Sequence, residues 1–593
     1  MLGPIFNREA LTLPRRASHY RARSFYLGGL WVLGFTAWQV LYGWGQTVSQ
    51  GDLAYFGMIA FQLLAFSQLI LVQFFAALIA AGAVAQEKDR RTLILLLVSD
   101  LRDREIILGK LFGSLLQMSL LIIASVPLLS LLLLLGGISF LQVWNTFFIL
   151  LGSSIAAGSL GGLLAFWRDK TYQALALTML FLLLYLICVE GLALVLGVWI
   201  GPETAQGLLL RLNPFRALAW VVNPPVSGTA APTYEFIGMM VALSIGLNLL
   251  TLWKLRVWNP SGEPIIKPDA EKPAAATPLR DDSIEEHNIH AAPGKVRKVW
   301  SNPILWREIC TRAYGRRPLL LKLMYLVLVI LIAAYAIQQL PTPEKAYRLE
   351  PGFGFVPVLV LSFLLLNAQA VTSITSERDL NSLELLLVTQ ITPKEFIFGK
   401  LGGIFFNAKE FLVPPLVFLV LLGVWGYCGG ETLVYLLLVT LLFFAFMAML
   451  GLYIGLRTVR SRLAIGHSLG TVFFLFIGTM LCIYLILVSG QFEYQFFSFL
   501  VFLAIGAIGL WWVLGGQNPS MAISVAAWVC PLAMFYTITN VLIGNPRTGK
   551  AGDPLWPFLV VMGAFGFTLL AMAVPLLSEF KVVLGHNAPA AEE

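Results

Sequence analysis

Charged residues are scarce in this chain of 593 residues: only 12% are Asp, Glu, Lys or Arg, and the mean hydropathy is +0.81. A soluble protein of this length needs more charge than this, because most of its surface must be solvated. The composition therefore excludes a soluble protein. The net charge of +8 is better explained by basic loops on the cytosolic side of a membrane than by affinity for nucleic acid.

Cysteines and catalytic motifs are also few. The five cysteines lie far apart, mostly in apolar stretches, and indicate neither a disulfide framework nor a metal site. The patterns H-E-x-x-H and G-x-S-x-G are absent. Residues 544–551 nearly fit a phosphate-binding loop, but Ala551 replaces the hydroxyl residue that would hold Mg²⁺. We therefore expect no catalytic residue, no metal ion and no cofactor in this chain.

Long apolar segments occupy most of the sequence. Runs of 18 or more residues recur, and each is long enough to cross a hydrocarbon layer of about 30 Å as a helix. They predict an all-α polytopic membrane protein with roughly 12–14 transmembrane helices. Two segments are less regular: residues 202–225 are expected to dip into the membrane without crossing, and residues 496–543 to form either two spans or a re-entrant hairpin.

The chain divides at residues 259–300, which are rich in proline, alanine and charge and predict a disordered linker. Residues 1–258 then form a first six-span unit, and residues 301–593 a second unit with six to eight spans. Arginines precede the first apolar run, which argues against a cleavable signal. Lys and Arg are concentrated in alternate loops, so we expect both termini and the linker on the cytosolic side of an inner or plasma membrane.

The two halves carry an internal repeat. Residues 87–111, EKDRRTLILLLVSDLRDREIILGKL, align without a gap to residues 377–401, ERDLNSLELLLVTQITPKEFIFGKL, with 12 of 25 positions identical. The segments Pro4-Ile-Phe-Asn-Arg8-Glu9 and Pro303-Ile-Leu-Trp-Arg307-Glu308 also match. Each half has an even number of spans, so the repeat is parallel rather than inverted.

Each copy of the repeat predicts a short amphipathic helix between the second and third spans of its half. Leucines at i, i+3 and i+4 form an apolar stripe after an acidic start. In the second copy Thr392 and Glu395 predict a capping box, whereas the first copy keeps Glu105 but lacks the threonine. A lipid-surface helix is the alternative; the duplication in register favours contact with a cytosolic partner. The residues assigned to this contact are Glu87, Asp89, Leu93, Leu96, Leu97, Gly109, Lys110, Glu377, Asp379, Leu383, Leu386, Leu387, Gly399 and Lys400.

These features resemble the type-2 family of ABC transporter permeases. The resemblance rests on the Pro-x-x-x-Arg-Glu entry, on the acidic, leucine-rich loop that ends in Gly-Lys, and on Asn213-Pro214-Phe215 before the sixth span. It covers both halves and implies two permease units fused in one chain. It also implies that each loop is a coupling helix seated on a separate cytosolic ABC ATPase subunit, which would bind ATP and Mg²⁺. Most members of the family are exporters. The counterpart of Asn213-Pro214-Phe215 in the second half is Cys530-Pro531-Leu532, a departure that suggests unequal halves.

Two alternatives to an ATP-driven permease stay open: a gradient-driven secondary transporter with twelve helices in two halves, which shares the parallel halves and central linker, and a non-transporting scaffold. Charged residues inside the spans are candidates for a substrate path. We assign a possible role of this kind to Glu190, whereas Lys409 and Glu410 are better explained by snorkelling or mutual pairing. The sequence does not identify the substrate.

Overall fold

A computed structural model gives the fold. It describes residues 3–12, 17–43, 48–224, 231–259, 300–310, 318–339, 352–380, 382–383, 386, 391–458, 460–489, 495–515, 520–543 and 553–578. In these ranges the chain forms helices and no strand. The expected linker at residues 259–300 lies almost entirely outside the described residues, as do residues 544–551.

The first half contains six long helices and several short ones. A short helix, α1 (Gly3–Thr12), precedes the first long one. The long helices are α2 (Ala17–Tyr42), α3 (Gln50–Asp89), α5 (Asp103–Leu131), α6 (Phe140–Trp167), α7 (Thr171–Ile200) and α10 (Ala231–Trp258). Between α3 and α5 lies α4 (Thr92–Val98), and a 3-10 turn, Leu132–Leu135, follows α5. The segment expected to dip into the membrane forms two short helices, α8 (Pro202–Leu212) and α9 (Pro214–Val222).

The second half repeats this order with one substitution. The helices are α11 (Pro303–Cys310), α12 (Pro318–Gln339), α13 (Gly352–Asp379), α15 (Pro393–Val424), α16 (Gly430–Arg457), α17 (Ser461–Ser489), α18 (Gln495–Gly515), α19 (Met521–Ile543) and α20 (Leu555–Ser578). In place of the short α8 and α9 stand α18 and α19, of 21 and 23 residues. Within α19, residues Met521–Asn540 are long and apolar enough to cross the hydrocarbon layer, whereas the apolar part of α18, Phe499–Gly515, is shorter.

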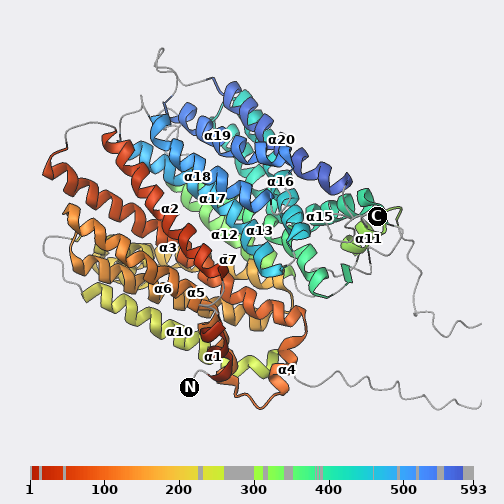
Figure 1. The fold of residues 1–593 in the computed structure, drawn as a ribbon, viewed down its shortest axis with the longest axis horizontal. Coiled ribbons are helices and arrows are strands. Elements are labelled where there is room, and N and C mark those ends of the chain that lie inside the picture. The colour runs from red at the N-terminus through yellow and green to blue at the C-terminus, as the bar shows by residue number, and fades with distance from the viewer. Residues whose placement is uncertain are drawn as a thin grey trace, which may run out of the picture.

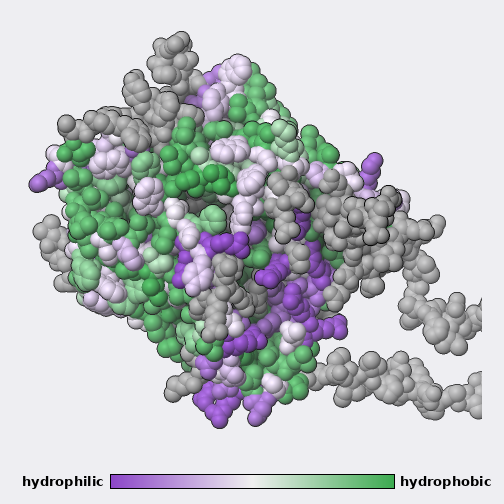
Figure 2. Space-filling model, in the orientation of Figure 1, coloured by the Kyte–Doolittle hydropathy of each residue, from purple (hydrophilic) through white to green (hydrophobic). Residues whose placement is uncertain are grey.

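The helices are of membrane-spanning length. Among the described residues eleven helices are long and apolar enough to cross a membrane, and three shorter apolar helices accompany them. The prediction of an all-α polytopic membrane protein is confirmed. Hydrophilic side chains gather at one end of the bundle, around α1 and α4, whereas the flanks are largely hydrophobic (Figures 1 and 2). We call this the polar end; it also holds α11 and the starts of α5, α7, α15 and α17.

Glycines set the closest helix packing within each half. A Cβ on Gly161 of α6 would lie 2.2 Å from the carbonyl oxygen of Ala77 in α3. A Cβ on Gly451 of α16 would lie 2.6 Å from the Cβ of Ala370 in α13. The interval between these glycines equals that between Glu87 and Glu377. The counterpart of Ala77 at this interval is Asn367, whose carbonyl oxygen would lie 3.0 Å from a Cβ on Gly451, so the contact recurs at the same place in the repeat. Small residues allow membrane helices to approach in this way, where packing rather than the hydrophobic effect drives association.

The two halves meet along a seam with matching partners on each side (Figure 1). In the first half α7 packs against α12 and α13, and in the second half α17 packs against α2 and α3. The helices α3 and α13 touch each other between these two contacts, and α18 also packs on α2. Because α2, α3 and α7 occupy the same places in the repeat as α12, α13 and α17, the seam has an approximate two-fold relation.

Candidate functional site

The first loop of the repeat forms a tight turn and a short helix. Helix α3 ends at Asp89, and Arg91 has a φ of 58°, the only positive φ of a non-glycine residue among those described. The turn is closed by backbone hydrogen bonds from Arg90 N to Gln86 O and from Arg91 N to Lys88 O, each of 3.0 Å. The loop is therefore a compact connection that joins α4 directly to the end of α3.

Helix α4 has apolar residues on every side. Leu93 and Leu97 are buried, and Leu96 is half-buried against the same core. Three further apolar residues, Ile94, Leu95 and Val98, are 45%, 70% and 68% exposed. The predicted leucine stripe thus faces the protein, and the residues available to a partner lie on the opposite face. A helix at the polar end that exposes this much apolar surface is typical of a contact site.

The second loop follows the same plan where it is described. Ser382, Leu383 and Leu386 are helical, with Leu383 buried and Leu386 half-buried, whereas Leu387 lies outside the described residues. The Ser382 hydroxyl donates to the Glu377 carbonyl oxygen at 3.1 Å, as the Thr92 hydroxyl does to the Glu87 carbonyl oxygen at 3.3 Å. The two loops therefore share their anchoring as well as their sequence.

The predicted capping box begins the helix after the second loop. The Glu395 amide donates to the Thr392 hydroxyl at 3.2 Å, and the Thr392 amide donates to the Glu395 carboxylate at 2.9 Å. In the first half the second of these bonds is present, from the Arg102 amide to the Glu105 carboxylate at 3.2 Å. The first bond has no counterpart with a hydroxyl acceptor, because Arg102 stands in place of the threonine. The predicted difference between the two copies is confirmed.

The repeated glutamate and lysine of each loop form ion pairs inside their own half. Glu87 at the end of α3 pairs with Lys110 of α5. Glu377 at the end of α13 pairs with Lys400 of α15, with 2.7 Å between Oε1 and Nζ. These residues thus fasten the second span to the third. The sequence prediction assigned these glutamates and lysines to partner contact. In the structure they pair with each other between the second and third spans of their half.

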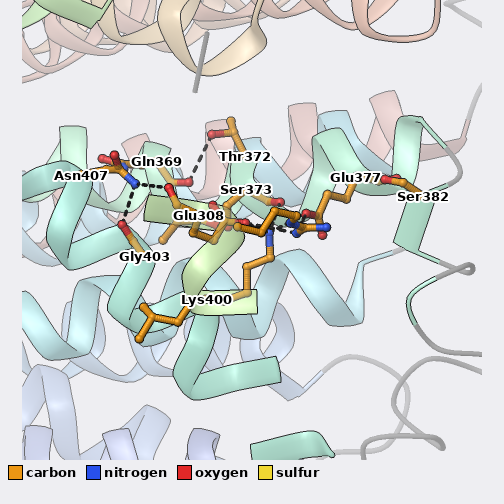
Figure 3. A network of polar contacts seen from close by, with 12 residues as sticks. Glu308, Gln369, Thr372, Ser373, Glu377, Ser382, Lys400, Gly403 and Asn407 are labelled. Carbon is orange, nitrogen blue, oxygen red and sulfur yellow. Dashed lines mark hydrogen bonds and ion pairs between the residues drawn. The ribbon is translucent and has the colours of Figure 1, made fainter. Parts of the chain in front are cut away.

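In the second half this pair is part of a larger network (Figure 3). The Lys400 ammonium, 1% exposed, also donates to Glu308 Oε1 of α11 at 2.6 Å. Arg307 pairs with both Glu377 and Glu308. Burial disfavours the charged Glu308 carboxylate, but Lys400 and Arg307 outweigh it and hold the pKa of Glu308 below its usual range. The network joins α11, α13 and α15 at the polar end.

Close packing supports this network. A Cβ on Gly403 would lie 2.4 Å from the Cβ of Glu308, and one on Gly399 would lie 2.8 Å from the side-chain oxygen of Asn302. The repeated glycine of the Gly-Lys motif therefore lets α11 lie directly on α15. In the first half Gly109 is buried and α1 packs on α5 in the same way, but Glu9 pairs with Arg8 at 3.0 Å. Equivalent residues of the two halves therefore form different ion-pair networks: Glu308 pairs with Lys400, whereas its counterpart Glu9 pairs with Arg8.

The two aspartates of the loops lie at the seam between the halves. Asp89 accepts a hydrogen bond from the Thr171 hydroxyl at 2.7 Å, and Asp379 accepts one from the Ser461 hydroxyl at 3.0 Å. Both aspartates are buried. Sequence reasoning missed Thr171 and Ser461, the first residues of α7 and α17, although both are hydroxyl residues in the same place in the repeat.

Glu190 lies toward the other end of the bundle and is paired. Its carboxylate accepts hydrogen bonds from Asn213 Nδ2 at 2.8 Å and from Arg216 Nε at 3.0 Å. These contacts tie α7 to the start of α9, where the Asn213 side chain also accepts from the Phe215 amide at 2.9 Å. The counterpart residue Cys530 instead lies within α19, where its thiol is 3.0 Å from the Thr568 hydroxyl. A substrate-path role for Glu190 stays a prediction.

The neighbouring charges Lys409 and Glu410 each have another partner, so the suggested mutual pairing is wrong. Glu410 Oε1 of α15 lies 2.5 Å from the Lys322 ammonium of α12. The neighbouring Lys409 ammonium lies over the Phe406 ring, 4.5 Å from its centroid. No group of three or more potential metal ligands occurs in the described part of the chain.

Comparison with known proteins identifies the first half. A search of curated proteins finds no match. Residues 34–259 match the family model described as ABC-2 family transporter protein. The match runs from within α2 to the end of α10 and so includes α4 and the Glu87–Lys110 ion pair between α3 and α5. Residues 34–259 are therefore similar to an ABC-2 family transporter domain, and the eleven helices of membrane-spanning length in the described residues make the chain an integral membrane protein.

Proposed function

We propose that this chain is the permease of an ABC exporter, with two fused ABC-2 units and a separate cytosolic ATPase. ATP and Mg²⁺ would bind to that ATPase and not to this chain. The polar end would face the cytosol, together with both termini and the linker at residues 259–300, in an inner or plasma membrane. Lys and Arg concentrated in the loops of this end support that orientation.

The exposed apolar face of α4 carries the proposal. Ile94, Leu95 and Val98 form this face. The ion pair between Glu87 and Lys110 joins the end of α3 to α5, the two helices that flank α4 in the sequence. A partner that covers the face would remove apolar surface from water, which is the dominant favourable term in most protein association. Because α4 is joined to α3 by a closed turn, a movement of the partner would be transmitted to the spans.

The repeat supports a two-unit permease. The second loop has the same hydrogen-bond anchoring, the same glutamate–lysine pair and the same buried leucine as the first. Matching helices pair across the seam, as expected when one chain supplies both halves of a transport path. The family match to residues 34–259 favours this function over a gradient-driven transporter.

The test is a pull-down of the tagged protein from its native membrane in mild detergent, followed by mass spectrometry. Leu95→Asp/Val98→Asp should abolish recovery of an ABC ATPase while leaving insertion and monodispersity unchanged. Leu134→Asp is the matched control, because Leu134 is 83% exposed in an apolar turn at the opposite end of the bundle. ATPase recovery unaffected by the α4 variant would refute α4 as the coupling helix. No ATPase with the wild-type chain, even after cross-linking, would refute the permease function and favour the gradient-driven alternative.

A further inference from the structure

Asp89 and Asp379 each connect two helices across the seam. The Asp89 Oδ2 atom accepts from Thr171 of its own half at 2.7 Å and from the Ser376 hydroxyl of the other half at 3.1 Å. The Asp379 Oδ1 atom accepts from Ser461 of its own half and, at 2.8 Å, from Arg90 Nη2 of the other half. Arg90 Nε donates to the same Asp379 oxygen at 3.1 Å. Each aspartate therefore bonds to one residue of its own half and to one residue of the other half.

This arrangement follows the repeat. Asp89 and Asp379 occupy matching positions, and so do Thr171 and Ser461 as the first residues of α7 and α17. Only the cross-seam donors differ: a serine on α13 in one case and the arginine after α3 in the other. We call the set Asp89, Arg90, Thr171, Ser376, Asp379 and Ser461 the seam latch. Its position at the polar end places it where the two halves close against each other.

The bonds across the seam are of a kind that can be exchanged for water. The Arg90 side chain is 54% exposed, so the donor of this ion pair is accessible to water although the Asp379 side chain is 3% exposed. The Ser376 bond joins a neutral hydroxyl to a carboxylate at 3.1 Å. By contrast, the Glu377–Lys400 pair inside the second half is almost fully buried. The donors across the seam are thus an accessible guanidinium and a neutral hydroxyl, whereas the donor inside the second half is a buried ammonium.

The latch is also coupled to the loop helix. Only Arg90 and Arg91 separate Asp89 from α4, and the closed turn leaves little freedom between them. A displacement of α4 would therefore carry Asp89 away from Ser376 and Arg90 away from Asp379 at the same time. The contacts across the seam would then break together. Asp89 would keep its hydrogen bond from Thr171, and Asp379 would keep its hydrogen bond from Ser461.

We propose that the seam latch closes the path between the halves at the polar end and opens when the loop helices move during the transport cycle. The proposal rests on the proposed function, because it assigns the movement to the ATPase. Beyond the proposed function, it names the residues that hold the closed state and the hydrogen bonds that must break when the path opens.

The test is a disulfide across the latch. A variant with its five native cysteines replaced by serine would carry Asp89→Cys and Ser376→Cys, and a protease site inserted within residues 260–299 would allow the halves to be separated on a gel. Oxidation in inside-out vesicles without nucleotide should link the halves in high yield. ATP with an inhibitor that traps the nucleotide-bound ATPase should lower that yield several-fold.

A second cysteine pair, Asp103→Cys with Arg256→Cys, is the matched control. These residues pair at 2.8 Å at the same end but within the first half, so nucleotide should not change their cross-linking. An Asp89–Ser376 yield that stays unchanged by nucleotide, while the ATPase co-purifies and hydrolyses ATP, would overturn the latch and leave the proposed function standing. Absence of any ATPase would overturn both.

Charge exchange gives an independent test if the cysteine variant fails to fold. Arg90→Glu places a second carboxylate beside Asp379 and should raise ATP hydrolysis by the complex in the absence of substrate several-fold, because the closed state is weakened. Arg90→Glu/Asp379→Arg should return hydrolysis toward the wild-type rate. A double variant no closer to wild type than the single one would overturn the contact between Arg90 and Asp379.

Discussion

Replacement of Lys400 by methionine should destabilise the second half strongly. Lys400 is 1% exposed and bonds to two carboxylates, Glu308 at 2.6 Å and Glu377 at 2.7 Å. Lys400→Met keeps most of the side-chain volume but leaves both carboxylates buried, with Arg307 as their remaining cation. Removal of one partner from a buried ion pair typically costs about 3–5 kcal/mol, because the other charge is left uncompensated.

The neutral variant separates charge from packing. Lys400→Met/Glu308→Gln/Glu377→Gln removes the ammonium and both carboxylate charges and leaves Arg307, whose side chain is 30% exposed and can be solvated by water. Replacement of a buried ion pair or triad by neutral groups is often close to neutral in stability. We therefore expect the triple variant to recover most of the loss. Lys110→Met should cost less than Lys400→Met, because Lys110 is 10% exposed and has the single carboxylate partner Glu87.

The measurement is the melting temperature of each purified variant in one detergent, followed by the fraction that stays monodisperse after heating. We expect the order wild type, Lys110→Met, Lys400→Met from most to least stable, with the triple variant near the top. It would be refuted by a triple variant as unstable as Lys400→Met, because packing rather than charge would then explain the loss.

Three further predictions concern packing, pairing and pH. Gly451→Val should lower the melting temperature by several degrees, because even a Cβ at this position meets Ala370 at 2.6 Å. Lys322→Met should destabilise more than Lys322→Met/Glu410→Leu, since the single change leaves a carboxylate unpaired within the membrane; equal losses would contradict the pairing. The lowered pKa of Glu308 contributes stability above the ordinary glutamate pKa of about 4.3, lost as pH falls through the folded-state pKa. Melting temperatures measured from about pH 5 down to about pH 3 should therefore fall more steeply for wild type than for Glu308→Gln.

The sequence was sufficient for the span pattern and the duplication, because both are local or periodic signals. The capping box of Thr392 and Glu395 was also predictable, since its two residues are three positions apart. The face of α4 that is exposed to a partner could not be predicted from the sequence. Six of its seven residues are apolar, so a stripe at Leu93 and Leu97 gave no information on which side would meet a partner.

The contacts of the loop acids needed the structure for another reason. Glu87 and Lys110 are repeated together, which signals a connection, but the same pattern fits pairing with each other or with a partner protein. The bond between Asp89 and Ser376 joins residues of different halves, and no spacing rule relates them. Cross-seam contacts of this kind depend on how the two bundles dock, which local patterns do not determine.

The environment of α7 has a consequence for how the chain is made. Residues 171–180, its first ten, are all buried, and part of that burial comes from α12 and α13. Ribosomes add roughly 5–20 residues per second, so α7 enters the membrane on the order of ten seconds before those helices exist. During that interval Gln173 and the other polar groups of this segment lack their final surroundings. A lipid, an insertion factor or a temporary neighbour must shelter this surface until the second half arrives, which makes the interval after α7 the vulnerable stage of biogenesis.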